Sequence, residues 1–162
     1  MKFFEYLNYQ KPLPSYLVEK SIEQTKKSQD TFIKEGELKD LDFYRYDAPE
    51  ELIVWIKQHY NFTKDLPNSF FSIQGIKYNI PIHIDRNRIF ALNYILYSGG
   101  DDVYTSWYDQ NKNHLHSEFL KKNLWHKFNT GIYHGVHGLS PTEFRIAVSV
   151  DLVKLNLIPN VI

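Results

Sequence analysis

A short segment, residues 80–85 with the sequence IPIHID, combines two side chains that bind metal ions. His83 and Asp85 are two positions apart, and this spacing places both side chains on one face of an extended strand. An imidazole and a carboxylate on one face supply two thirds of a facial metal site, which leaves the remaining coordination positions open. The segment therefore predicts a metal centre, provided that a later histidine completes it.

The best match for that histidine is His134. His137 is an alternative, but it precedes Gly138 and lies only eight residues before Arg145. The 51 residues between His83 and His134 leave room for about four strands with their loops. Two strand ends that are distant in the sequence can therefore meet at the mouth of one roll.

Arg145 follows His134 by 11 residues, inside the apolar run FRIAVSV of residues 144–150. A guanidinium on a buried strand needs an anionic partner. Two partners remain open from the residues alone, a bound anion or an acid of the fold. In the purely structural alternative, His83 and Asp85 bond to each other or to the backbone while Arg145 pairs with such an acid.

The order His83-x-Asp85, a distant His134 and Arg145 on the last predicted strand resembles the Fe(II)- and 2-oxoglutarate-dependent oxygenases, over about residues 70–152. The resemblance implies that the first three residues bind iron and form the catalytic centre, and that Arg145 clamps the far carboxylate of 2-oxoglutarate. It also implies that dioxygen is consumed, that a C–H substrate is hydroxylated, and that 2-oxoglutarate is decarboxylated to succinate. Halogen transfer is not expected, because Asp85 keeps the carboxylate ligand that halogenating relatives lack.

The sequence departs from the family next to the arginine. Relatives often have Arg-x-Ser on the last strand, whereas Ala147 occupies that position here. Ser149 lies two residues further along the same strand face, and Tyr78 and Asn93 lie in predicted strands beside the H-x-D segment. We expect these three residues to help Arg145 bind the cosubstrate. Arg88 is either a second contact for the anion or an exposed strand charge, and we expect the exposed charge.

A second group of potential ligands raises a rival interpretation. A cupin-like protein could bind a metal through His114, His116 and Glu118, with His126 or His134 as a further ligand. The alternative function is thus a non-catalytic or cupin-like metal-binding jelly roll. The polar residues 109–113 before this group instead favour histidines exposed on a loop. His59 is expected to be a histidine at a helix end.

The elements that position these residues fall into two parts of one predicted domain, residues 1–162. Residues 1–65 form a helical cover: an extended arm, a helix over about 16–29, and a helix capped by Asp47 that buries Leu52, Trp55 and Ile56. From residue 69 to 152 the apolar pattern is typical of strands, at about 69–78, 80–85, 88–97, 103–108, 114–119, 125–129, 132–136 and 144–152. Short strands with brief turns favour a mainly β fold with N-terminal helices, a double-stranded β-helix (jelly roll, cupin-like barrel).

Composition narrows the class of partner. Lys plus Arg and Asp plus Glu number 19 each, so the formal net charge is zero, which favours a small molecule or a protein side chain over nucleic acid as the substrate. The sequence has no cysteine and no run of about 20 apolar residues. We therefore expect a soluble cytoplasmic protein that does not act at a membrane. Residues 1–65 and the loop of residues 97–106 are expected to shape substrate entry.

Overall fold

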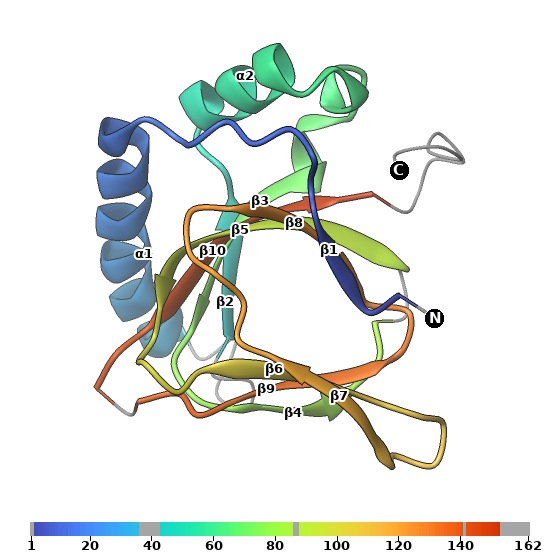
Figure 1. Ribbon diagram of the computed structural model, residues 1–162. Coiled ribbons are helices and arrows are strands. Elements are labelled where there is room, and N and C mark those ends of the chain that lie inside the picture. Colours follow the sequence, from blue (N-terminus) through green and yellow to red (C-terminus); the bar gives the residue numbers. More distant parts are fainter. Residues whose placement is uncertain (1, 36–42, 86–87, 141, 153–162) are drawn as a thin grey trace.

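Two antiparallel β-sheets face each other in the computed structural model, which describes residues 2–35, 43–85, 88–140 and 142–152 (Figure 1). The six-stranded sheet has the order β1-β8-β5-β10-β3-β2, and the four-stranded sheet has the order β4-β9-β6-β7. The strands are β1 (Phe4–Tyr6), β2 (Phe43–Asp47), β3 (Phe71–Ile76), β4 (Ile80–His83), β5 (Phe90–Ser98), β6 (Tyr104–Tyr108), β7 (His114–Glu118), β8 (Trp125–Asn129), β9 (Tyr133–His137) and β10 (Arg145–Asp151). The prediction of a mainly β protein with N-terminal helices is confirmed.

Eight of these strands, β3 to β10, correspond to the eight strands that the apolar pattern predicted. Two short strands were not predicted. β1 belongs to the N-terminal arm and pairs with β8, while β2 pairs with β3 at the other edge of the larger sheet. Both are edge strands, so each has a neighbouring strand on one side only.

The two helices are α1 (Ser15–Glu35) and α2 (Glu50–His59), which lie against the same face of the larger sheet (Figure 1). α1 continues past the predicted end at about residue 29. The prediction that Asp47 caps α2 was wrong, because Asp47 ends β2 and Pro49 is the N-cap, without a side-chain hydrogen bond. Leu52, Trp55 and Ile56 are buried on α2 as predicted.

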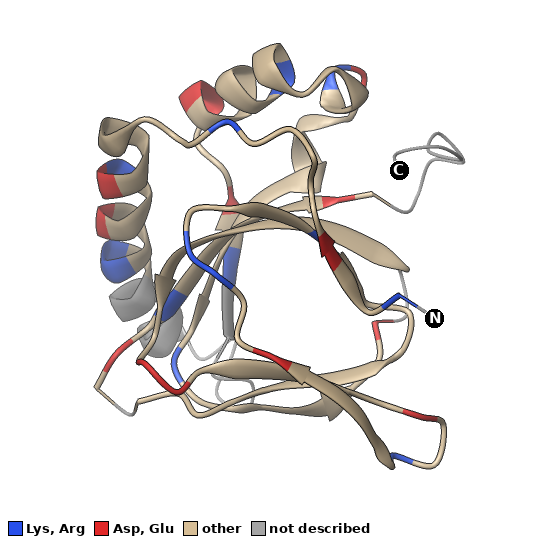
Figure 2. Ribbon diagram, in the orientation of Figure 1, with Lys and Arg blue, Asp and Glu red and all other residues tan. Residues whose placement is uncertain are grey.

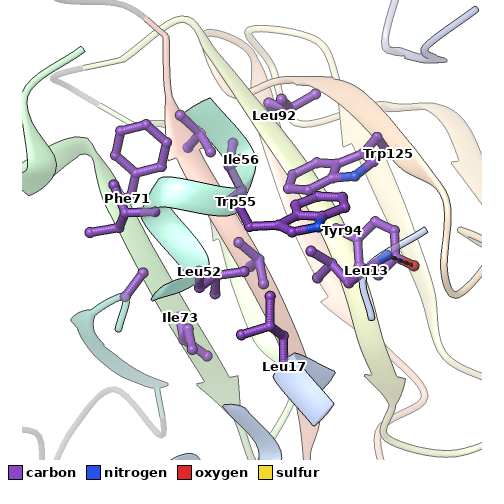
Figure 3. Packing of buried hydrophobic residues seen from close by; sticks show 14 of the residues in the cluster. Leu13, Leu17, Leu52, Trp55, Ile56, Phe71, Ile73, Leu92, Tyr94 and Trp125 are labelled. Atoms are coloured by element: carbon purple, nitrogen blue, oxygen red, sulfur yellow. Dashed lines mark hydrogen bonds between the residues drawn. The ribbon is translucent and has the colours of Figure 1, made fainter. Parts of the chain in front are cut away.

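The main hydrophobic core lies between the helices and the larger sheet (Figure 3). Leu17 of α1 and Leu52 and Ile56 of α2 contribute from the helices. The sheet contributes the side chains that alternate toward them, which are Phe71, Ile73, Leu92, Tyr94, Leu96, Trp125, Ile146, Val148 and Val150. The opposite face of the same strands is therefore turned toward the smaller sheet.

A second cluster joins the two sheets. Trp107 of the smaller sheet packs with Ile95, Phe128 and Ala147 of the larger sheet, together with Leu120. Residues two positions away from these on the same strands share their direction. We call the face of the larger sheet that carries Ile95, Phe128 and Ala147 the interior face.

Both helices carry charged residues of both signs, interspersed along α1 and divided on α2 between acids in the first turn and Lys57 in the last (Figure 2). Lys27 pairs with Glu23 within α1, and Lys20 of α1 pairs with Glu51 of α2.

No helix in the described part of the chain is long and apolar enough to cross a membrane.

Candidate metal centre

His83, Asp85 and His134 come together at one end of the two sheets. Each offers one ligand atom, and these atoms all lie within 4.8 Å of one another. His83 ends β4 and stands opposite His134 of β9 in the antiparallel register, with ring centroids 4.3 Å apart. No other group of potential metal ligands was found among the described residues. The predicted constellation is thus brought together.

The register between the two strands depends on an irregularity in β4. Ile80 pairs with Val136 and His83 with His134, so β4 spans one residue more than β9 between these two pairs. Pro81 lies in this stretch, where the missing N–H of proline is tolerated. Without the extra residue, Ile82 rather than His83 would stand opposite His134.

Both histidines are held in the tautomer that suits metal binding. The Nδ1 of His83 is 2.9 Å from the carbonyl oxygen of Pro81, and the Nδ1 of His134 is 2.9 Å from that of Ile132. Since a carbonyl oxygen only accepts hydrogen bonds, each Nδ1 carries the proton. Each Nε2 therefore keeps its lone pair for a metal ion, with the ring oriented by its backbone partner.

The carboxylate of Asp85 is divided between two neighbours. Its Oδ2 accepts a hydrogen bond of 2.6 Å from Nε of Arg88, and its Oδ1 lies 3.7 Å from Nε2 of His83. The backbone N–H of Asp85 donates to the carbonyl oxygen of Thr130, at 3.2 Å. Oδ2 thus has a hydrogen-bond partner in Arg88, while Oδ1 lies on the side of His83.

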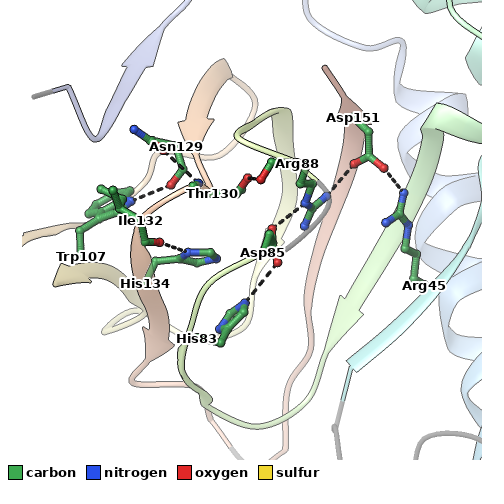
Figure 4. A network of polar contacts seen from close by, with 11 residues as sticks. Arg45, His83, Asp85, Arg88, Trp107, Asn129, Thr130, Ile132, His134 and Asp151 are labelled. Atoms are coloured by element: carbon green, nitrogen blue, oxygen red, sulfur yellow. Dashed lines mark hydrogen bonds and ion pairs between the residues drawn. The ribbon is translucent and has the colours of Figure 1, made fainter. Parts of the chain in front are cut away.

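Arg88 connects this carboxylate to the larger sheet (Figure 4). Its Nη1 donates to Oδ1 of Asp151 at 2.7 Å, and the other oxygen of Asp151 accepts from Arg45 of β2 at 2.6 Å. The prediction that Arg88 is exposed was wrong, since its side chain is only 17% exposed and is paired with two acids. Burial disfavours the charge of Arg88, but Asp85 and Asp151 outweigh this effect and raise its pKa.

One side of the centre is closed and the other is open. His134 is buried, its ring contacts Phe128 at 5.1 Å between centroids, and it pairs in register with the buried Trp107. Burial, with the neighbouring His83 as a lesser cause, lowers the pKa of His134 to about 4. The His83 side chain is 39% exposed. A neutral, metal-binding imidazole at 134 is therefore favoured at neutral pH, and ligands can approach from the side of His83.

Arg145 lies on the interior face of the larger sheet, because it is two residues before Ala147 on β10. It is 7% exposed, and burial lowers the pKa of its guanidinium to about 10. No hydrogen bond or ion pair joins this guanidinium to a residue that the structure describes. The acid of the fold that the structural alternative requires is thus not present among the described residues.

Four polar side chains share the interior face with Arg145, and we call them the interior polar group. Ser149, Asn93 and His126 are register neighbours on β10, β5 and β8, while Gln74 pairs with Ala147 on the next row. In each of them a buried side-chain atom has no hydrogen-bond partner among the described residues. Those atoms are Gln74 Nε2, Asn93 Oδ1, His126 Nε2 and Ser149 Oγ. Unsatisfied buried polar atoms around an unpaired cation are suited to a polar anionic ligand.

The predicted helpers of Arg145 are thus only partly brought together. Asn93 and Ser149 belong to the interior polar group. Tyr78 does not, because it lies in the turn between β3 and β4, with 44% of its surface exposed and its ring against the ammonium group of Lys77. The prediction that Tyr78 lies in a strand was therefore wrong.

The rival ligand set is not assembled. His114 bonds to Ser117, and His116 contacts Glu118 at 3.6 Å on the edge strand β7, whereas His126 lies in the other sheet. His137 bonds to the hydroxyl of Tyr108 instead of joining the metal centre. His59 donates to the carbonyl oxygen of Trp55 at the end of α2, as expected of a helix-end histidine.

Sequence reasoning missed Arg88, Asp151, Gln74 and the interior position of His126. No local signal could have found the pairing of Arg88 with Asp151, which lies 63 residues away. The strand period could have placed His126, since it lies two residues before Phe128.

No protein-family model matches this chain, and no curated protein matches it significantly.

Proposed function

We propose that the chain is an Fe(II)- and 2-oxoglutarate-dependent dioxygenase that hydroxylates a C–H substrate. The observation that carries the proposal is the pairing of two features, the His83, Asp85 and His134 centre and the buried Arg145 without an acidic partner among the described residues. Two imidazoles and one carboxylate with open positions are the donor set of non-haem Fe(II) oxygenases. An unpaired buried guanidinium is suited to the far carboxylate of 2-oxoglutarate.

The order of the strands supports the finer proposal of a jelly roll. Successive strands β3, β4, β5 and β6 alternate between the larger and the smaller sheet. β6 and β7 pair within the smaller sheet, after which β8, β9 and β10 alternate again. This path is the one expected of a double-stranded β-helix, and it brings β4 beside β9 although their histidines are distant in the sequence.

The chain's own residues would have separate tasks. The Nε2 atoms of His83 and His134 and the free Oδ1 of Asp85 would hold the iron. When bound, iron and 2-oxoglutarate would supply the oxidising chemistry, with decarboxylation to succinate. Arg145 and the interior polar group would orient the cosubstrate, and Trp107 and Phe128 would exclude water behind His134.

The substrate class follows only from charge and exposure. The formal net charge is zero and the charges on the helices are mixed in sign, which favours a small molecule or a protein side chain over nucleic acid. The exposed side of His83 is the side from which such a substrate would approach.

Anaerobic titration tests the proposal. Wild-type protein with Fe(II) and 2-oxoglutarate should give a visible charge-transfer band, and His83→Ala should abolish it because a ligand is lost. His137→Ala is the matched control, since His137 lies on β9 outside the centre, and it should keep the band. A wild-type protein without a band would contradict the proposal.

One observation favours a second candidate function, a metal-binding jelly roll without turnover. The His83, Asp85 and His134 group alone suffices for this function, because these three side chains can hold a metal whether or not a cosubstrate binds. Measurement of succinate release under air distinguishes the two functions. Metal binding without a 2-oxoglutarate band and without succinate would support the second candidate.

A further inference from the structure

The contact between Arg88 and Asp85 fixes which carboxylate oxygen is free. Arg88 Nε lies 2.6 Å from Oδ2 of Asp85, and the His83 ring faces Oδ1. Oδ1, 3.7 Å from Nε2 of His83, is thus the oxygen that Arg88 leaves without a hydrogen bond. A carboxylate with one oxygen hydrogen-bonded to an arginine has the other oxygen available to coordinate a metal ion.

Arg88 is itself held in place by two further contacts. Its Nη1 donates to Asp151 at the end of β10, and its backbone carbonyl accepts from the hydroxyl of Thr130 at 3.0 Å. The Arg88 and Asp151 side chains are 17% and 19% exposed. The guanidinium therefore has two charged partners in a partly buried position, which restricts its motion more than a single surface ion pair does.

We propose that Arg88 is a positioning residue that keeps Asp85 in one-oxygen coordination of the metal. This inference rests on the metal centre of the proposed function and deepens it. With one oxygen from Asp85, the three residues leave three open positions on an octahedral ion. If both oxygens coordinated the metal, one of these positions would be lost, and a chelating 2-oxo acid would leave no room for dioxygen without a further change.

Arg88 is proposed to orient Asp85 through the geometry of its guanidinium, and not only to neutralise its charge. A lysine at position 88 would keep the positive charge, but it lacks the planar fork whose Nε and Nη1 meet two different acids here. The orientation of Asp85 would then be lost although the local net charge is unchanged. Arg88→Lys and Arg88→Met should therefore behave alike at the metal.

The test uses the full chain with Mn(II), a paramagnetic ion of the same charge as Fe(II). Bound exchangeable waters are counted by electron paramagnetic resonance in isotopically labelled water, with and without 2-oxoglutarate. Arg88→Met should lose one bound water relative to wild type in both states, so that its complex with chelated 2-oxoglutarate keeps none where the wild-type complex keeps one. Arg45→Met is the matched control, because Arg45 pairs with the other oxygen of Asp151 and does not touch Asp85. It should leave the water count unchanged.

The apo form of each variant is first checked by thermal unfolding. If Arg88→Met does not fold, Asp151→Asn replaces it, since this change removes the second anchor of Arg88 and should shift the same two readouts in the same direction. Water counts equal to those of wild type, both with and without 2-oxoglutarate, in the Arg88 or Asp151 variant would overturn the role of Arg88 alone. A wild-type protein that binds no Mn(II) or Fe(II) would overturn both this inference and the proposed function.

Discussion

His83 and His134 stand directly opposite each other on β4 and β9, because β4 carries one extra residue between Ile80 and His83. A slip of one residue in an antiparallel pair turns every side chain of the slipped strand to the opposite face. The metal centre therefore depends on the register of a strand of only four residues. Asp85, beyond the end of this strand, is held by Thr130 and Arg88 instead.

Replacement of Arg145 should separate ligand binding from stability. Arg145→Met removes the buried cation and keeps most of its apolar volume, so the free energy of unfolding of the apo protein should stay unchanged or rise. The affinity for 2-oxoglutarate should fall by about 2–5 kcal/mol, as expected when one member of a buried charge pair is removed. Calorimetry and urea denaturation measure the two effects.

Arg145→Lys is the control for charge. It keeps the positive charge without the bidentate fork, so its 2-oxoglutarate affinity should lie between those of the wild type and Arg145→Met. Metal affinity should not change in either variant. Equal losses of metal and 2-oxoglutarate binding would indicate that Arg145 serves the fold instead.

Protonation of the buried His126 side chain should make the apo protein less stable in acid. Burial lowers the pKa of His126 to about 4, whereas in the unfolded chain the group has its ordinary pKa of 6.5. Between these two values the unfolded state binds more protons, so the free energy of unfolding falls as the pH falls from about 6.5 to about 4. His126→Gln should remove roughly 3 kcal/mol or less of this loss.

Urea denaturation of the apo protein across this pH range checks the His126 prediction. His134 contributes in the same direction, because burial also lowers its pKa to about 4, so part of the acid effect should remain in His126→Gln. A variant with the same pH dependence as wild type would show that His126 is not buried in its neutral form.

Gly99→Ala should disturb the start of β10. Gly99 has φ +84°, and a Cβ there would lie 2.8 Å from the backbone nitrogen of Arg145 and 2.5 Å from the side chain of Leu139. We expect a loss of about 1–2 kcal/mol from the backbone conformation alone, with weaker 2-oxoglutarate binding because Arg145 must shift. Thermal unfolding and calorimetry measure these effects.

Gly100→Ala is the matched control for Gly99→Ala. Gly100 also has a positive φ, of +131°, but a Cβ there meets its nearest neighbour, Val103, at an ordinary 3.5 Å. It should therefore lower stability without a comparable effect on 2-oxoglutarate. Similar binding losses in both variants would argue against a specific contact between Gly99 and Arg145.

Replacement of His114 and His116 together by alanine should leave metal loading unchanged. These residues lie on β7, outside the centre. A modest loss of stability is expected, because His116 stacks on Phe3 at 5.3 Å between ring centroids and on Trp107 at 5.8 Å. Metal content after dialysis checks the prediction, and reduced loading in a folded variant would revive the cupin-like interpretation.

The strands and the metal ligands were predictable because they depend on local periods. Alternation over two residues placed β3 to β10. The spacing and order of His83, Asp85 and His134 predicted the ligand set, although Asp85 lies beyond the end of β4 and is held by Arg88 and Thr130. β2 was missed because its partner β3 lies about 30 residues further along the chain, and pairing at that distance has no local pattern. Asp47 was mistaken for a helix cap because an acid before proline also occurs at a strand end.

Long-range charge pairing was the part that the sequence could not reveal. Arg88 was expected to be an exposed strand charge, yet it pairs with Asp85 and with Asp151, which lie in two different parts of the chain. Whether an arginine is paired depends on the three-dimensional position of acids that no spacing rule specifies. The prediction that Tyr78 lies in a strand was wrong for a different reason, because β3 ends two residues earlier than the apolar pattern indicated.

β10 is bonded to β5 on one side and to β3 on the other, and it carries Arg145 at its first residue and Asp151 at its last. Heat or denaturant that frees this central strand would release both ends at once. If the proposed function is correct, affinity for 2-oxoglutarate and the fixed orientation of the Asp85 carboxylate should consequently be lost in a single cooperative transition, without a partly competent intermediate.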